Sequence, residues 1–272
     1  MSRIARKFAE LRERGEGALI AFLTAGDPKP SLTPRMARAL LEHADVLELG
    51  IPFSDPIADG PSIQAASERA LSAGTTPETV LEIIERVRGA SEKPIVVLSY
   101  YNIVFKFGVE RFARRLAGAG GDGLIVPDLP AEESVEMAKV ARRHGLDLVL
   151  LASPTTTPGR MKLICELSGG FLYLVSLLGV TGAREHLSSE VRELVVRARS
   201  FSKGRLPLAV GFGISRPEHV REVLRCGADG AIVGSAFVDI VARRPRNGRR
   251  MLRELGGLAQ ALKEATRSKH QP

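Results

Sequence analysis

The stretch that joins a short apolar run to a long proline-rich loop reads Val46-Leu-Glu-Leu-Gly-Ile-Pro-Phe-Ser-Asp-Pro-Ile-Ala-Asp-Gly-Pro-Ser-Ile-Gln64. The apolar run predicts a buried strand, and Glu48 places in it a carboxylate that is costly to bury without a purpose. Further along, Asp59 lies in a segment that prolines and a glycine keep from forming a helix or a strand. One acid on a strand and one on a loop indicate catalysis. The alternative is a structural Glu48 with Asp55 and Asp59 as turn-forming residues.

Seven other runs of β-branched and aliphatic residues accompany this one, with helical spacing of apolar residues between them, as at Val80, Ile83, Ile84 and Val87. Strands that alternate with helices predict a parallel sheet covered by helices. Eight such units favour a closed (β/α)8 TIM barrel of the α/β class. An open doubly wound sheet is the alternative, but no Gly-x-Gly-x-x-Gly turn follows an early strand. The predicted strands are Ala18–Leu23, Asp45–Leu49, Pro94–Ser99, Gly123–Val126, Asp147–Leu151, Phe171–Ser176, Pro207–Val210 and Gly230–Val233.

The length of 272 residues and an apolar fraction of 44% fit one barrel domain over residues 1–272. An extra N-terminal helix from about Ser2 to Arg14 is expected to cover the bottom of the barrel. The longest intervals between strands follow the second and sixth runs. Because loops after the strands form the active-site face of such barrels, both long loops are candidate functional segments.

Composition excludes several classes of function. The net charge is +8, but the basic residues are scattered and no aromatic-interleaved basic groove accompanies them, so nucleic-acid binding is not expected. The charge instead favours anionic metabolites. Cys165 and Cys226 lie far apart without a metal-ligand pattern, which predicts buried thiols, no metal site and a reducing compartment. With no signal peptide and no membrane-spanning run, the protein is expected to be cytoplasmic.

Three glycine-rich segments follow the last three predicted strands. They read Gly179-Val-Thr-Gly182, Gly211-Phe-Gly-Ile-Ser215 and Gly234-Ser235. Glycine lets backbone amides approach an anion closely, and the helices that follow direct N–H groups toward it. Single glycines merely permit tight turns, but three such segments at neighbouring strand ends predict a phosphate site. The absence of a Walker sequence favours a phosphorylated metabolite over a nucleoside triphosphate.

These motifs together closely resemble the tryptophan synthase alpha subunit family, nearly from end to end. The residues that carry the resemblance are the stretch Leu47–Pro61, Phe22, Thr24-Ala-Gly-Asp-Pro28, Gly123-Leu-Ile-Val-Pro-Asp-Leu-Pro130, Tyr173 and the three glycine-rich segments. The resemblance implies a cofactor-free lyase that cleaves indole-3-glycerol phosphate to indole and glyceraldehyde 3-phosphate in tryptophan biosynthesis. It also implies a beta subunit partner that carries pyridoxal phosphate, in an alpha2beta2 heterotetramer.

The resemblance assigns roles residue by residue. Glu48 is implied as the proton shuttle, with a pKa raised by its apolar surroundings. Asp59 is implied to accept the indole N–H, and its position on a loop suggests that it arrives only when substrate is present. The other implied residues are Gly182, Gly213, Gly234 and Ser235 for the phosphate, Phe22, Tyr173 and Phe212 for the indole pocket, and Asp55 and Thr181 for loop closure.

One segment departs from the family pattern. Leu177 follows Ser176 where many members carry an arginine, and the sequence alone assigns this change no consequence. Two alternatives to the lyase subunit stay open. One is a free-standing indole-3-glycerol phosphate lyase, and the other is a non-catalytic subunit that activates a beta enzyme.

Overall fold

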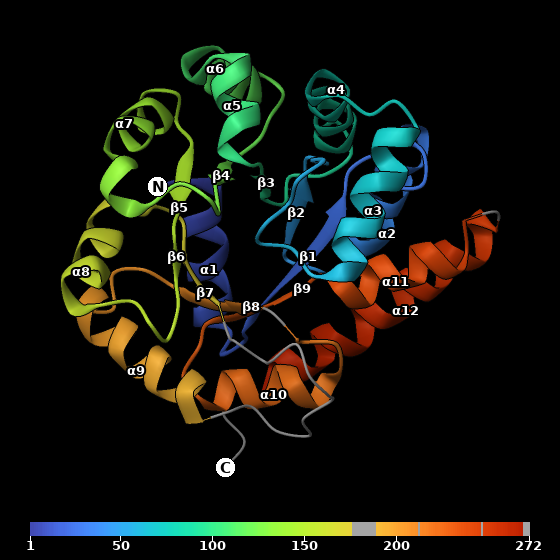
Figure 1. Ribbon diagram of the computed structural model, residues 1–272. Helices are drawn as coiled ribbons and strands as arrows, with labels where there is room; N and C mark the ends of the chain where they lie inside the picture. Colours follow the sequence, from blue (N-terminus) through green and yellow to red (C-terminus); the bar gives the residue numbers. More distant parts are fainter. Residues whose placement is uncertain (176–188, 212, 246, 269–272) are drawn as a thin grey trace.

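The computed structural model describes residues 1–175, 189–211, 213–245 and 247–268. Within them, nine parallel strands form a ring that helices surround, as Figure 1 shows. This arrangement confirms the predicted TIM barrel. The strands are β1 (Ala18–Thr24), β2 (Val46–Gly50), β3 (Ile95–Leu98), β4 (Gly123–Ile125), β5 (Asp147–Val149), β6 (Leu151–Ala152), β7 (Leu172–Val175), β8 (Leu208–Gly211) and β9 (Gly230–Val233).

The fifth predicted strand is divided into β5 and β6, and this division corrects the expected count of eight. The first part pairs with β4 and the second with β7, so the chain changes partners at Leu150. The Leu150 carbonyl accepts a hydrogen bond from the Tyr173 N–H at 3.1 Å. The segment that contains β5 and β6 therefore closes the ring between β4 and β7. On the opposite side, β1 pairs with both β2 and β9.

The strands are buried on both faces, as parallel strands covered by helices must be. Along β2, Leu47 and Leu49 belong to the large apolar cluster between strands and helices. Val46 belongs to the separate cluster that fills the inside of the ring. Because successive side chains alternate in direction, Glu48 shares the inner face with Val46.

Among the described elements, most strands are followed by one α-helix, and β2, β3 and β9 are followed by two. The described helices are α1 (Arg3–Glu13), α2 (Thr33–Leu41), α3 (Pro61–Ser72), α4 (Pro77–Arg88), α5 (Tyr101–Phe107), α6 (Val109–Gly118), α7 (Val135–Arg143), α8 (Pro158–Leu167), α9 (Ser189–Ser202), α10 (Pro217–Arg225), α11 (Ser235–Arg243) and α12 (Gly248–Ala265). The proline-rich loop after β2 ends before Gln64, the last residue of the stretch quoted from the sequence, because Pro61 is the first residue of α3. Proline suits that position, where its missing N–H costs nothing.

Helix α1 begins and ends where the sequence predicts and closes one end of the barrel. Ser2 caps its N-terminus by accepting a hydrogen bond from the Ala5 N–H at 3.1 Å. Its buried face, formed by Ile4, Phe8 and Leu11, belongs to the inner cluster. Figure 1 shows this helix within the outline of the ring of strands.

Replacing Phe8 with alanine is expected to lower the free energy of unfolding by about 3–5 kcal/mol, because the removal of a buried aromatic ring leaves a cavity. Phe8 is 3% exposed, and its ring lies 5.8 Å from that of Phe171. Urea denaturation measures the change. A loss below about 1 kcal/mol would mean that α1 contributes little to the barrel core.

Cys165 is buried as predicted, whereas Cys226 is only half-buried because it follows the last residue of α10. In the part of the chain that the structure describes, no helix is both long and apolar enough to cross a membrane.

Candidate active site

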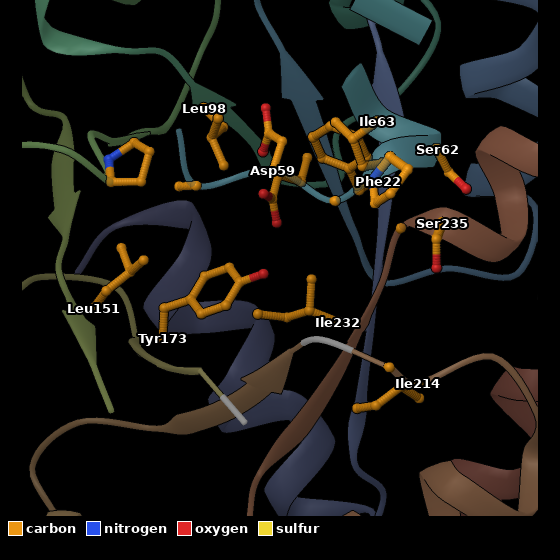
Figure 2. Close-up of a pocket in the computed structure, with 17 residues that line it drawn as sticks. Phe22, Asp59, Ser62, Ile63, Leu98, Leu151, Tyr173, Ile214, Ile232 and Ser235 are labelled. Atoms are coloured by element: carbon orange, nitrogen blue, oxygen red, sulfur yellow. The ribbon is translucent and has the colours of Figure 1, made fainter. Parts of the chain in front are cut away.

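A pocket of about 280 Å³ opens where the carboxyl ends of the strands meet. Figure 2 shows Ser62 and Ser235 on one side of this pocket and Leu98 and Leu151 on the other. Asp59 and Tyr173 lie between these two sides, and the Tyr173 hydroxyl points into the pocket. The pocket therefore has a polar end and an apolar end. Its lining includes seven residues predicted from the sequence, namely Phe22, Glu48, Asp59, Tyr173, Gly213, Gly234 and Ser235, together with Leu98 and Leu151.

Glu48 reaches the pocket from the inner face of β2. Only 1% of the residue is exposed, and within the described structure its Oε2 atom has no hydrogen-bond partner. Burial, reinforced by the nearby charge of Asp59, raises the pKa of this carboxyl to about 8. Because the ionised form is poorly solvated here, Glu48 is mainly a protonated acid at neutral pH.

Asp59 lies two residues before α3 and already lines the pocket. The expectation that its arrival depends on substrate stays a prediction. The Tyr100 hydroxyl, from the segment that follows β3, lies beside the Asp59 carboxylate. Burial raises the pKa of Asp59 to about 6, and the hydrogen bond from Tyr100 opposes that rise. Asp59 is consequently mainly ionised at neutral pH.

The two acids occupy different environments in one pocket. Glu48, fully buried and with no partner for Oε2 among the described residues, keeps its proton, whereas Asp59, half-buried and beside the Tyr100 hydroxyl, loses it. Because their pKa values differ, one carboxyl can act as the proton donor while the other stabilises positive charge. The arrangement suits acid–base chemistry on a substrate held between them.

The polar end of the pocket contains three of the four predicted phosphate residues. Gly213 has a φ of +74°, a left-handed conformation that favours glycine. Gly234 precedes Ser235, the first residue of α11. The first N–H groups of a helix lack partners within it and attract anions. Gly213, Gly234 and Ser235 all line the pocket.

Two aromatic residues predicted for the indole pocket form part of its wall. The Phe22 ring lies close to Gly50, where an added Cβ would be 2.7 Å from the ring. The Tyr173 hydroxyl lies close to Gly211, where an added Cβ would be 2.5 Å from it. Both glycines therefore leave room for the rings, and an apolar wall of this kind suits a flat aromatic ligand.

Several predicted residues are not brought to the pocket by the described structure. Asp55 is exposed, does not line the pocket, and accepts a hydrogen bond from the neighbouring Ser54 hydroxyl. Its predicted role in loop closure stays a prediction. Thr181, Gly182 and Phe212 lie outside the described residues, as does the Leu177 departure.

Sequence reasoning missed Tyr100, which lies beside Asp59, and most of the aliphatic lining of the pocket. The lining residues Leu98, Leu151 and Ile232 each lie at or near the carboxyl end of a strand. That position is the signal that could have identified them, because side chains at strand ends face the active-site side of a barrel. Among the described residues, no three histidine, cysteine or acidic side chains gather as a metal site.

Comparison with known proteins gives one consistent family. The family model for the tryptophan synthase alpha chain matches residues 8–267. The tryptophan synthase alpha chain of Methanosarcina barkeri is 49% identical over 262 residues, covering 96% of both chains. That of Methanoregula boonei is 47% identical over 266 residues, covering 97% of this chain and 98% of the relative.

Solved structures agree with these sequence relatives. The tryptophan synthase subunit alpha of Legionella pneumophila has a TM-score of 0.89 at 38% identity, covering 98% of both chains. A chain of the tryptophan synthase a2b2 complex of Pyrococcus furiosus has a TM-score of 0.85 at 42% identity, covering 91% of this chain and 98% of that one.

Proposed function

The chain belongs to the tryptophan synthase alpha chain family, and from that premise we propose that it cleaves indole-3-glycerol phosphate to indole and glyceraldehyde 3-phosphate. One observation carries the proposal. A protonated Glu48 and an ionised Asp59 share a pocket whose far end has the glycines and helix start that suit a phosphate. The aromatic and aliphatic wall between them suits the indole ring.

The proposed reaction breaks one carbon–carbon bond and needs two proton transfers. Glu48 donates its proton to the indole carbon that carries the glycerol chain, and positive charge develops at the ring nitrogen. The Asp59 carboxylate accepts a hydrogen bond from that N–H and stabilises the charge. The ionised Glu48 then takes the proton of the side-chain hydroxyl, the carbon–carbon bond breaks, and its electron pair returns to the ring. Indole and the aldehyde are the products.

We propose a beta subunit as the partner, in an alpha2beta2 heterotetramer in the cytoplasm. The related Pyrococcus furiosus chain belongs to an a2b2 complex. Two large apolar side chains on segments that follow β2 and β3 support such a contact, since Ile57 is 84% exposed and Phe105 is 65% exposed. Pyridoxal phosphate is expected only in that beta subunit, and the alpha reaction as written uses no cofactor.

Release of indole from indole-3-glycerol phosphate tests the proposal. The purified chain is assayed alone and then with the beta subunit of a close relative. Slow release that the partner accelerates supports the lyase subunit. Fast release without acceleration would instead indicate a free-standing lyase, and no release in either condition would indicate a non-catalytic activating subunit.

The pH dependence of kcat/KM is expected to be bell-shaped. Asp59 must be ionised to accept the N–H, so activity falls as the pH drops below about 6. Glu48 must be protonated to begin the reaction, so activity falls as the pH rises above about 8. A pH–rate series in constant ionic strength measures both limbs. A flat profile across this range would contradict the assignment of both acids.

A further inference from the structure

Tyr100 makes three contacts with the loop that carries Asp59. Its ring stacks on that of Phe53, with centroids 5.1 Å apart and an angle of 28° between the planes. Its hydroxyl accepts a hydrogen bond from the Ala58 N–H at 2.9 Å and lies beside the Asp59 carboxylate, whose pKa it lowers. The Tyr100 hydroxyl therefore binds the loop at Ala58, the residue next to Asp59.

The barrel in turn holds Tyr100 firmly in place. The residue is 1% exposed, follows β3, and caps the N-terminus of α5. Asp128, on the loop after β4, accepts a hydrogen bond from the Tyr101 N–H at 2.8 Å. The Ser99 N–H donates to the Ile125 carbonyl at 3.0 Å and so continues the pairing of β3 with β4. Tyr100 is thus a rigid point against which the proline-rich loop is fixed.

We propose that Tyr100 is a positioning residue for the reaction, whose hydroxyl fixes the Asp59 carboxylate over the pocket in the orientation that meets the indole N–H. This inference rests on the proposed function. Asp59 lies on a loop, and a hydrogen-bond acceptor stabilises developing charge well only when its place is set before the reaction. The hydrogen bond from the Ala58 N–H fixes the loop, and the proposed hydrogen bond from the Tyr100 hydroxyl fixes the Asp59 carboxylate.

The charges around Asp59 favour the same role. Glu48 from β2 and Tyr173 from β7 also face it, and the negative charge of Asp59 raises the pKa of each. Burial, the charge of Asp59 and, to a smaller extent, that of Asp128 raise the pKa of the Tyr100 hydroxyl, which stays protonated as a donor. Because the donated bond lowers the pKa of Asp59, removing it should raise that pKa.

Replacing Tyr100 with phenylalanine removes the hydroxyl and keeps the ring that stacks on Phe53. We expect kcat for indole release to fall about tenfold, as for the loss of one hydrogen bond to a charged group. The acidic limb of the pH profile should also move to higher pH, because Asp59 then protonates earlier. A merely structural role would lower activity without moving that limb.

Tyr101→Phe is the matched control. Its ring packs against Phe105, with centroids 5.9 Å apart, and its hydroxyl makes no hydrogen bond within the described residues. It should leave kcat and the pH profile unchanged. An equal loss in both variants, or an unmoved acidic limb in Tyr100→Phe, would overturn the proposal.

A double-mutant cycle with Asp59→Asn tests the positioning role of Tyr100 separately from the role of Asp59 in the proposed reaction. If Tyr100 acts through Asp59, Tyr100→Phe causes no further loss in the Asp59→Asn background. A further tenfold loss there would overturn the positioning role alone. Undiminished cleavage by Asp59→Asn itself would instead overturn the role of Asp59 in the proposed function.

A second substitution tests the same bond without deleting it. A 3-fluorotyrosine at position 100 keeps the ring and the hydroxyl but makes the hydroxyl a stronger donor. The acidic limb should then move to lower pH, opposite to the shift in Tyr100→Phe. This variant keeps the test decisive if Tyr100→Phe folds poorly, and an unmoved limb would again overturn the proposal.

Discussion

Glu48→Gln is expected to lower the rate of indole formation by about 10³-fold, because an amide can neither donate the proton to the indole carbon nor accept the hydroxyl proton. The substitution should cost little stability. Burial raises the pKa of Glu48 to about 8, so the native side chain is mainly uncharged at neutral pH and the amide matches it in charge and shape. Single-turnover measurements with saturating substrate report the loss.

The binding of a non-cleavable indole phosphate analogue provides the complementary measurement, and its Kd should change by less than about threefold. Glu42→Gln is the matched control, because it makes the same chemical change at an exposed carboxylate just after α2. Turnover that survives in Glu48→Gln would refute the proton-shuttle role. A large loss in both variants would mean that the effect does not belong to the carboxyl in the pocket.

Gly234→Asp is expected to raise the KM for indole-3-glycerol phosphate by about 10²–10³-fold. An added Cβ at position 234 would lie 3.4 Å from the Phe22 ring, which is ordinary contact, so the side chain itself can be accommodated. The new carboxylate would lie beside the phosphate, where two like charges about 4 Å apart repel by about 4 kcal/mol at an effective dielectric constant near 20.

Gly234→Asn separates charge from shape, because its side chain has the same size without the negative charge. The KM of this variant should rise far less. Inorganic phosphate should still compete with the substrate in Gly234→Asn but no longer in Gly234→Asp. Equal KM values for the two variants would mean that bulk alone disturbs the pocket. Unchanged affinity in Gly234→Asp would remove the phosphate site from this end of the barrel.

Much of the fold could be predicted because burial in this architecture has a short-range signature. The eight apolar runs and the helix over Ser2–Arg14 were predicted within a few residues. The division of the fifth run at Leu150 was not, because it depends on which neighbour offers hydrogen bonds at each point of the closed ring. Pairing between strands has no local pattern that a single chain segment can reveal.

The candidate site divides in the same way. Glu48, Asp59, Gly234 and Ser235 could be selected because acids and glycines at strand ends are unusual in their own local context. Tyr100 could not be distinguished from Tyr101, its neighbour of the same type. The difference between them is tertiary, since only the hydroxyl of Tyr100 meets the loop at Ala58 and Asp59.

The sequence by itself therefore determined the alternation of strands and helices, the place of Glu48 on a strand and the glycine-rich strand ends, because each follows from residue type and spacing along the chain. Only the tertiary structure decided the difference in protonation between the two acids and the place of Asp59. A pKa depends on how much solvent and which donors surround a carboxyl. For Glu48 and Asp59, those surroundings come from segments far apart in the sequence that meet only when the barrel closes.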